Sequence, residues 1–515
     1  DNNLTSLDVS TNTAITTMWC YDNQFTALDL SANTALTTLY CYGNALTSLD
    51  VSANTALTTL SCQSNPELFC IQVADVDQAE QDWGGGISSW MGFSTDCESY
   101  VLPIYVPDDN FEQALIDLGY DSALDNYVAA GNISGVTSLD VREKEISDLT
   151  GIEGFTALTV LICKENNLSA LDVSALTALT ELKCQENNLS TLDVSANTGL
   201  TFLNCGGNNL EAIDVSVNTA LTTFNTFENN LTSLDVSQNT AITTMYCYQN
   251  QITALDVSAL TQLEVLSCSN NDLTTLDLST NTALTTLYVY NNQLTVLDVS
   301  VNTALDYLSC YDNQLTALDV SANTALTELD CSGNQITALD VTNNTALTNL
   351  YCHLNQLTTL DVSANTALIE LDCNENDLTA LDVSANTALE YLHFGDNDLT
   401  ALDVSANTAL TELYCNENDL TALDLSTNTA LTKLHFPNNQ LTSVDLSANT
   451  ALEWLASGSN DLTALDLSAN TALTTIRSGG NELTALDLSA NTALTYLSCS
   501  NNLLTALDVS ANTAL

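Results

Sequence analysis

The fold of this chain is decided by residues 410–430, which read LTELYCNENDLTALDLSTNTA. The same 21-residue unit recurs in register from Ile15 to the last residue, Leu515, with one interruption between about Asn65 and Thr156. Its pattern is LxxLxCxxNxLTxLDVSxNTA, and positions are counted from its first Leu. Each unit is called a coil and is named by the number of its first residue. A period of this length built on leucines is typical of leucine-rich repeats, so the sequence predicts a solenoid of stacked coils.

Within each coil, apolar residues at positions 4 and 6, and again at 14 and 16, alternate with polar residues. This period of two predicts two short strands per coil. Position 9 is Asn in all twenty coils, and position 19 is Asn in every coil that continues to it except at Leu176 and Leu260. We expect these Asn side chains to bond main-chain groups of neighbouring coils. The predicted fold class is therefore a β-rich solenoid with short parallel strands.

The charge of the chain excludes some functions. There are 64 acidic residues against 6 basic ones, which gives a net charge of −58. This balance disfavours nucleic acid as a partner, because affinity for it comes from Lys and Arg, and it disfavours anionic membrane surfaces. It favours solubility, cation binding, or residence in a salty medium that screens the charges. No run of about 18 apolar residues is present, so we expect no membrane insertion.

The sixteen cysteines fall into two groups. Fourteen stand at position 6 of a coil, where other coils have residues such as Thr226, Val289 and Phe394. A metal ligand or disulfide partner could not be exchanged for Phe or Val, so these cysteines are predicted to be buried core residues. Cys70 and Cys97 lie in the interruption and are the predicted disulfide, which indicates an extracytoplasmic compartment.

The interruption divides the chain into three predicted domains. Residues 1–98 would be the end of a first solenoid, with residues 66–98 as its disulfide-stapled C-terminal cap. Residues 99–157, which include a predicted helix, would be the N-terminal cap of a second solenoid. Residues 158–515 would be its array, with 17 segments of the LxxLxC type. The chain starts and stops inside a repeat, so we expect a piece of a longer protein whose other domains are its neighbours.

The full pattern resembles the bacterial leucine-rich-repeat class called IRREKO, whose unit is two nested half-repeats. Residues 104–128 (IYVPDDNFEQALIDLGYDSALDNYV) and the segments NPELFCIQV and FSTDC around the predicted disulfide resemble sequences that bracket such arrays in large secreted proteins of Bacteroidota. The resemblance implies a secreted or cell-surface protein, often exported by a type IX secretion system. It implies no catalytic residues, because such arrays share none.

One outward surface hardly varies between coils. It consists of Asp at position 15 and Ser at position 17 and is called the ladder face. Carboxylates stacked at the strand spacing of about 4.8 Å repel one another unless each is hydrogen-bonded or shares a cation. Three alternatives follow: local hydrogen bonds to backbone or Ser, bridging by Ca²⁺ or Na⁺, or a flat surface that orders water or ice. No other cofactor is expected. The candidate cation ligands are Asp319, Asp340, Asp361, Asp382 and Asp403.

The other outward surface, at positions 3, 5, 7 and 8, varies widely and is called the strand face. It holds all thirteen Tyr of the coils and all three His. Rings concentrated on the strand side of a solenoid indicate a binding surface, although these positions could simply tolerate any residue. Ring stacking would suit a glycan, and large amphipathic anchors would suit a protein. The predicted ligand-binding residues are Tyr246, Tyr248, Tyr288, Tyr290, Tyr307, Tyr311, Tyr351, His353, Tyr391, His393, Tyr414, His435 and Trp454.

Little in the sequence points to an enzyme. No P-loop, GxSxG, HExxH or CxxC motif is present. His393 and His435 stand two coils apart, about 9–10 Å by strand spacing, which is too far for one metal ion. The leading hypothesis is a non-catalytic recognition or adhesion module, secreted or on the cell surface, that binds glycan or protein on another cell. The alternatives are a rigid acidic spacer, and an enzyme whose catalytic domain lies outside this segment.

Overall fold

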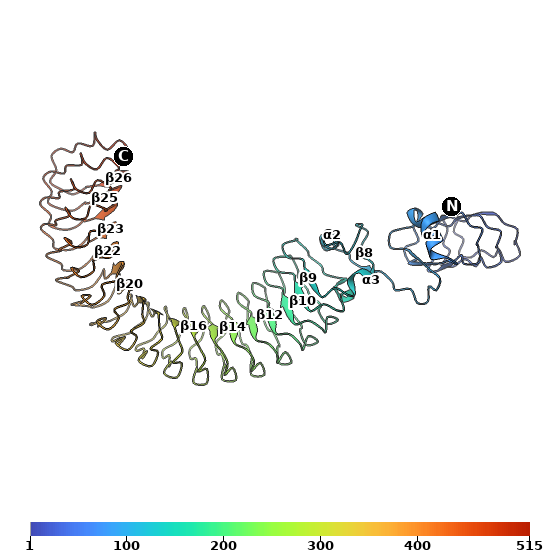
Figure 1. Ribbon diagram of the computed structural model, residues 1–515, viewed down its shortest axis with the longest axis horizontal. Coiled ribbons are helices and arrows are strands. Elements are labelled where there is room, and N and C mark those ends of the chain that lie inside the picture. The colour runs from blue at the N-terminus through green and yellow to red at the C-terminus, as the bar shows by residue number, and fades with distance from the viewer. Residues whose placement is uncertain (1) are drawn as a thin grey trace. The chain divides into compact units, whose positions relative to one another are not determined.

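A computed structural model describes residues 2–515, and the chain divides into two compact units, residues 1–200 and 201–515. Both are built from stacked coils, as the ribbon shows (Figure 1). Each unit is described separately. The prediction of a leucine-rich-repeat solenoid with parallel short strands is confirmed.

The unit of residues 1–200 contains short strands, three α-helices and two 3-10 helices. These elements are β1 (Thr17–Trp19), β2 (Thr38–Tyr40), β3 (Leu49–Asp50), β4 (Thr59–Ser61), β5 (Cys70–Gln72), α1 (Val76–Trp83), η1 (Gly84–Gly86), β6 (Gly92–Ser94), β7 (Ile104–Tyr105), α2 (Asp109–Asp117), β8 (Tyr127–Val128), α3 (Ala130–Ile133), β9 (Ser138–Asp140), η2 (Ile152–Gly154), β10 (Val160–Ile162) and β11 (Glu181–Lys183). Strands β1, β2 and β4 form one parallel sheet, and β3, β5 and β6 form another.

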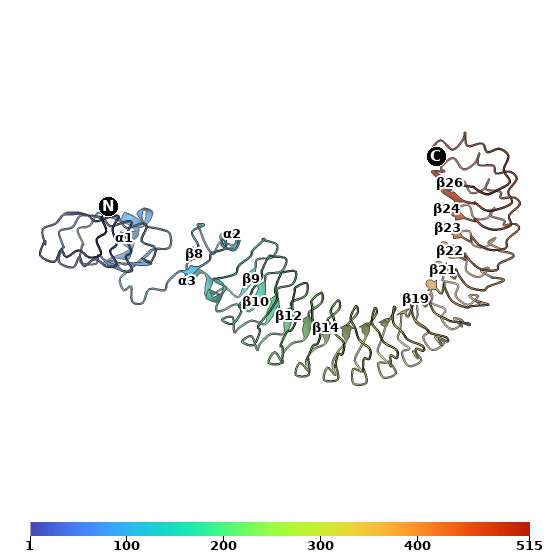
Figure 2. The same cartoon turned by 180° about the vertical axis from the view of Figure 1, so that it is seen from behind.

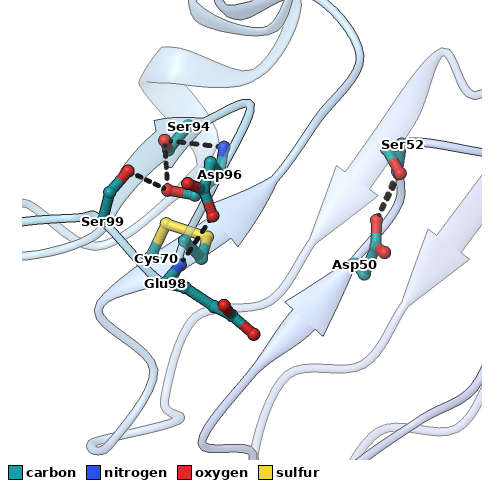
Figure 3. The surroundings of a disulfide bond; sticks show 8 residues. Asp50, Ser52, Cys70, Ser94, Asp96, Glu98 and Ser99 are labelled. Carbon is teal, nitrogen blue, oxygen red and sulfur yellow. Dashed lines mark hydrogen bonds between the residues drawn. A yellow bond between two sulfur atoms is a disulfide. The ribbon is translucent and has the colours of Figure 1, made fainter.

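The predicted cap at residues 66–98 is built from β5, α1, η1 and β6, and its disulfide is confirmed. Cys70 and Cys97 are bonded, with their Cα atoms 5.8 Å apart. The chain beyond the second cysteine is held by local hydrogen bonds, in which the Glu98 N–H donates to Asp96 and the Ser99 hydroxyl donates to the Asp96 carbonyl (Figure 3). Trp83 of α1 and Phe93 of β6 pack with ring centroids 6.0 Å apart, and this contact holds α1 against the sheet that contains β6.

The predicted helix within residues 99–157 is α2, and Asp108 caps its N-terminus. One carboxylate oxygen of Asp108 accepts the N–H groups of Asn110 and Phe111, which the helix itself leaves unbonded. The other oxygen accepts the N–H and hydroxyl of Ser147 at 2.8 and 2.7 Å. Because one side chain bonds both segments, Asp108 ties the helix to the first turns of the coils that follow it.

The unit of residues 201–515 is a regular stack with one strand in each coil, at positions 3 to 5. The strands are β12 (Phe202–Asn204), β13 (Thr223–Asn225), β14 (Thr244–Tyr246), β15 (Val265–Ser267), β16 (Thr286–Tyr288), β17 (Tyr307–Ser309), β18 (Glu328–Asp330), β19 (Asn349–Tyr351), β20 (Glu370–Asp372), β21 (Tyr391–His393), β22 (Glu412–Tyr414), β23 (Lys433–His435), β24 (Trp454–Ala456), β25 (Thr475–Arg477) and β26 (Tyr496–Ser498). Each pairs in parallel with its sequence neighbours in register, as in Leu392 beside Leu413.

The core of this unit is a column of leucines and cysteines. In coil 410 the side chains of Leu410, Leu413, Cys415 and Leu420 are fully buried, and the same positions are buried along the stack. The fourteen cysteines at position 6 are free thiols, and all are buried except Cys499, which follows the last strand and is half-buried. Burial raises the pKa of the Cys268 thiol to about 12, and the buried thiols pack as small apolar groups, as predicted.

The Asn residues at positions 9 and 19 bond the main chain, as predicted. Asn418 accepts the N–H of Leu399 in the preceding coil at 3.0 Å and donates to the carbonyls of Phe394 and Asn416. Asn428, at position 19, donates to two carbonyls of the preceding coil, at 3.0 and 2.9 Å. These bonds satisfy buried backbone groups that no strand partner reaches. The Asn side chains therefore form the frame that spaces the coils.

The prediction of a second strand in every coil was wrong. Among residues 2–515 it holds only at β3 and its partner β5, and as the isolated bridges Asp172–Asp193 and Leu234–Leu255. At positions 14 to 17 the backbone groups are used inside the coil: the N–H of Asn407 donates to the Val404 carbonyl, and the N–H of Ser405 donates to Asp403. In this unit the strands line the inner side of the bend in both views, so the coils diverge on the ladder side (Figures 1 and 2).

Two further features follow from this architecture. On the ladder side the diverging coils leave open grooves, one of about 600 Å³ lined by Leu318, Asp319, Asp340 and Asp361. The strand side is a continuous parallel sheet. None of the helices described in residues 2–515 is long and apolar enough to cross a membrane.

Candidate functional site

The strand face of residues 201–515 carries the thirteen predicted ligand-binding residues, and each of them is partly exposed. They stand at positions 3, 5 and 7 because side chains at positions 4 and 6 point into the core. The structure brings most of them into two groups of rings with an acidic stretch between them. The groups are described in chain order.

The first ring group consists of Tyr288, Tyr290, Tyr307 and Tyr311, from coils 284 and 305. Tyr290 and Tyr311, both at position 7, stack with centroids 4.4 Å apart and planes 6° apart. Tyr288 and Tyr307, at positions 5 and 3, meet at 4.8 Å with a tilt of 41°. Burial beside these neighbours raises the pKa of Tyr288 and Tyr307, so both phenols stay protonated. The four side chains thus form two ring pairs across the same two coils.

Of the two other predicted tyrosines nearby, Tyr248 stacks on a residue that the sequence reasoning missed. Phe227, at position 7 of the preceding coil, lies 4.9 Å from Tyr248 with planes 6° apart. The Phe227 ring covers Gly206, where an added Cβ would lie 2.6 Å from the ring. The sequence could have revealed this pair, because Phe227 and Tyr248 are aromatic residues at position 7 of consecutive coils. Tyr246 is separated from Tyr288 by the intervening strand β15.

The second ring group consists of Tyr391, His393, Tyr414, His435 and Trp454, from coils 389 to 452. Neighbouring rings in this series are 5.2 to 5.7 Å apart from His393 to Trp454, and Tyr391 lies 5.6 Å from Tyr414. Burial, with a smaller contribution from His393 and Arg477, lowers the pKa of His435 from 6.5 to about 4. The His435 imidazole is therefore neutral near pH 7 and packs as an aromatic ring.

The stretch between the ring groups, coils 326 to 368, is acidic. It holds Glu328, Asp330, Glu370 and Asp372 together with the predicted residues Tyr351 and His353. Burial raises the pKa values of Glu328 and Asp330. These carboxylates appeared unremarkable in the sequence because acidic residues are common throughout it.

Phenol groups bond carboxylates along this surface. The Tyr351 hydroxyl donates to Glu370 and accepts from Asn349 at 3.1 Å. The Tyr414 hydroxyl donates to Glu412 at 2.9 Å, and Lys433 forms an ion pair with the same carboxylate at 2.8 Å. Burial and these bonds raise the pKa values of Tyr351 and Tyr414 to about 12. Bonds between neighbouring coils hold the side chains in fixed positions, so the surface is preorganised.

Position 8, which the sequence reasoning counted as part of the variable face, is constrained by the backbone. Its residues have left-handed φ angles, such as 50° at Glu417, 53° at Leu354 and 59° at Gly333. Asn, Asp and Gly tolerate this region best, which explains much of the variation at this position. Positions 3, 5 and 7 are therefore the part of the strand face that is free to vary.

The candidate cation ligands of the ladder face are exposed, and each is hydrogen-bonded within its own coil. The N–H groups of Ser321, Thr342, Ser363, Ser384 and Ser405 donate to the respective aspartates at 2.9 to 3.0 Å. Hydrogen bonds from these hydroxyl and N–H groups lower the pKa values of Asp319, Asp340, Asp361, Asp382 and Asp403. A separate carboxylate group, Glu112, Asp121 and Asp125, lies in residues 99–157, with its oxygens within 4.8 Å of one another.

Comparison with known proteins finds a relative of similar repeat structure. The solved functional domain of internalin J from Listeria monocytogenes, described as including a cysteine ladder, is 35% identical; the match covers 76% of this chain and 77% of that chain, with a TM-score of 0.53. The curated internalin J of the same species is 42% identical over 70 residues, which is 14% of this chain and only 8% of that protein's length. No family model matches the chain.

More distant structures share the fold alone. Internalin F from Listeria monocytogenes is 22% identical, with a TM-score of 0.50 and coverage of 71% of this chain and 99% of that chain. The Arabidopsis receptor kinase HAESA, solved in complex with the peptide hormone IDA and the co-receptor SERK1, is 16% identical, with a TM-score of 0.60 and coverage of 96% and 79%.

Proposed function

Because the chain belongs to the internalin-like leucine-rich-repeat proteins, we propose that it is a non-catalytic recognition module that binds a protein partner through its strand face. The observation that carries this proposal is the second ring group, in which five side chains from four coils form one partly exposed aromatic surface. Interfaces between proteins are enriched in Tyr and Trp, which act as large amphipathic anchors.

A protein partner fits the ring geometry better than a glycan. Tyr290 and Tyr311 stack face to face, so each uses one ring face on the other. Stacking of a sugar needs free ring faces, whereas a protein partner can also pack against ring edges and bond the phenol hydroxyls. The continuous sheet surface also suits an extended interface more than a small-molecule pocket.

The cellular location and the bacterial origin of the protein are part of the proposal. The disulfide in residues 66–98 supports an extracytoplasmic location, on a bacterial surface or secreted. The Bacteroidota source and type IX export implied by the cap segments remain predictions, since the relatives named above come from Listeria monocytogenes. The acidic spacer is the alternative, and it requires no contact through the strand face.

The test is an adhesion assay in which beads coated with the whole chain settle on cultured cells. One variant carries Tyr391→Ser, Tyr414→Ser and Trp454→Ser, and another carries Tyr288→Ser, Tyr290→Ser, Tyr307→Ser and Tyr311→Ser. We expect at least one of them to reduce adhesion about tenfold or more, because anchor residues dominate interface energies. The matched control is Val296→Ser with Val301→Ser, which removes exposed apolar side chains at positions 13 and 18, off the strand face, and should leave adhesion unchanged.

Treatment of the cells separates the possible ligands. Adhesion that disappears after protease treatment but survives glycosidase treatment supports a protein partner. Loss after glycosidase alone would assign the surface to a glycan. Adhesion that neither ring variant changes would contradict recognition through the strand face and favour the spacer.

A further inference from the structure

The strand face of coil 410 binds a cation that the chain itself supplies. Glu412 of β22 accepts the Tyr414 hydroxyl at 2.9 Å and forms an ion pair with Lys433 of β23 at 2.8 Å. The two strands pair so that Lys433 stands directly beside Glu412, at position 3 of the next coil. A carboxylate, a phenol and an ammonium group from two neighbouring coils therefore form one cluster.

Coils 326 and 368 also carry a glutamate at position 3 that is bonded by a phenol. These residues are Glu328 and Glu370, and both are half-buried. Glu328 is hydrogen-bonded to the Tyr307 side chain, and Glu370 accepts the hydroxyl of Tyr351. Each glutamate therefore has the phenol partner that Glu412 has, from a tyrosine one coil earlier.

The residues beside these two glutamates in the next coils are neutral. Asn349 stands beside Glu328 and Tyr391 stands beside Glu370, at the position that is lysine in coil 431. No Lys or Arg occurs in residues 184–432. Side chains on this surface contact those of neighbouring coils, so within the described part of the chain no Lys or Arg is close enough to pair with either glutamate.

The two histidines of this stretch face a different carboxylate. Nδ1 of His393 lies 3.3 Å from Oδ2 of Asp372, and Nδ1 of His353 lies 3.8 Å from the same oxygen. These two imidazoles are therefore directed at position 5 of coil 368 and not at the glutamates of position 3.

The charge of the two glutamates is poorly compensated. Burial, together with repulsion by Asp330 and Glu370, raises the pKa of Glu328. A carboxylate that is partly removed from water and stands near like charges is stabilised by any cation that reaches it. A cation from outside the chain would therefore gain more at Glu328 and Glu370 than at Glu412, which Lys433 already pairs.

The rings on either side also favour a cation of the guanidinium or ammonium type. Tyr307 belongs to the first ring group and Tyr391 to the second, so aromatic side chains lie on both sides of the glutamates along the stack. The strand face already holds one such contact, because the guanidinium of Arg477 lies over the Tyr496 ring, 5.1 Å from its centroid. Lys and Arg are the side chains that combine carboxylate pairing with ring contact.

We propose that the partner of the strand face docks a basic segment, with Lys or Arg side chains, on Glu328 and Glu370. The inference rests on the proposed function and names the chemistry of its partner. One basic side chain would lie over Asn349, between the two carboxylates, because these three residues stand side by side on consecutive strands. The net charge of −58 would attract such a partner, and the ring groups would contact its apolar parts.

The test is the adhesion assay with beads that carry Glu328→Gln together with Glu370→Gln. We expect adhesion to fall about tenfold, because two charge-assisted contacts are lost while the size of each side chain is kept. The matched control is Asp340→Asn together with Asp382→Asn, which removes the same charge from the same two coils on the ladder face. It should change adhesion less than twofold. Equal losses in the two variants would assign the effect to overall charge and overturn the proposal.

A second variant blocks the glutamates without removing them. Asn349→Lys places an ammonium group beside Glu328, in the arrangement that coil 410 already uses. We expect adhesion to fall by a similar factor while the melting temperature does not fall, so unfolding cannot explain the loss. The matched control is Thr359→Lys, which adds the same charge at exposed position 13 of the same coil, off the strand face, and should leave adhesion unchanged. Full adhesion by Asn349→Lys would overturn the proposal.

Chemical modification of the cells tests the side chains of the partner. An amine-acetylating reagent neutralises exposed lysines, and phenylglyoxal modifies exposed arginines. We expect at least one treatment to lower adhesion of the unsubstituted chain to the level of the glutamate variant, and to have little further effect on that variant. Adhesion that both treatments leave unchanged would overturn the proposal.

The basic partner and the proposed function fail in different ways. Reduced adhesion in the ring variants with full adhesion in the glutamate variant would overturn the basic partner and leave recognition through the strand face intact. Adhesion that neither the ring variants nor the glutamate variant changes would overturn both.

Discussion

The two outward surfaces of the same coils satisfy their polar groups in different ways. On the ladder face of coil 410, Asp424 accepts the N–H of Ser426, two residues away. On the strand face of that coil, Glu412 is bonded by Lys433 from the next coil, and Tyr414 contacts rings on both sides. A residue satisfied within its own coil can be repeated without change. A residue satisfied by its neighbours makes each stretch of the stack different, and that is where specificity can arise.

The largest effect should come from the Asn frame that both faces share. Asn418→Ala leaves the N–H of Leu399 buried without a partner and removes one of the two side-chain donors to the carbonyl of Phe394, which keeps its bond from Asn397. We expect a loss of about 1–3 kcal/mol of unfolding free energy. Asp424→Ala, in the same coil, should lower the melting temperature only slightly because its carboxylate is exposed. Thermal melts and amide hydrogen exchange in coils 389 and 410 measure the loss of stability in each variant. Equal losses in Asn418→Ala and Asp424→Ala would contradict the conclusion that the Asn side chains stabilise the stack more than the ladder aspartates do.

A smaller effect should separate position 8 from the rest of the strand face. Gly333→Leu places a side chain at φ 59°, where an added Cβ would also lie 2.2 Å from a carboxylate oxygen of Asp312. We expect it to cost about 1–2 kcal/mol. The reverse change, Leu354→Gly at φ 53°, should be neutral or slightly stabilising. Chemical denaturation of the two variants checks the signs, and a stabilised Gly333→Leu would show that position 8 is not limited by the backbone.

A pH effect should mark the second ring group. His435 has a pKa of about 4 in the folded chain against 6.5 without its surroundings, so between these values the unfolded chain binds a proton that the folded chain does not. Stability from His435 is therefore full above about pH 6.5 and declines as the pH falls toward 4. Because the ring keeps some contact with water, we expect the unfolding free energy to fall by only about 1 kcal/mol over this pH range. In His435→Gln this part of the pH dependence should vanish. Thermal melts of the variant from pH 7 to pH 4.5 that showed the same pH dependence as the unsubstituted chain would refute the role of His435.

The smallest effect is expected on the ladder face. Because each of Asp319, Asp340 and Asp361 already accepts hydrogen bonds from its own coil, we expect millimolar Ca²⁺ to leave the melting temperature unchanged. Calorimetry with and without chelator checks this. A rise in melting temperature with Ca²⁺ that disappears when these three residues are changed to Asn would support cation binding on the ladder face. Both faces would then bind a partner from outside the chain.

Much of this molecule followed from the pattern of one coil. Cys70 and Cys97 were recognised because they break the period, and the Asn at position 9 because it never does. The second strand was mispredicted because alternation at positions 14 to 16 reports only which side chains are buried. Whether neighbouring backbones pair there depends on how far the coils diverge, which is a property of the whole stack.

The sequence by itself determined the repeat, the core and the two faces, because those depend on the spacing of residues within one coil. Only the tertiary structure decided which side chains on the strand face meet. Phe227 stacks on Tyr248 and Asp372 lies between two histidines because stacking brings residues about one coil apart in sequence into contact. Such contacts depend on side-chain direction and neighbour size, as at Gly206 beneath Phe227, and no single coil encodes them.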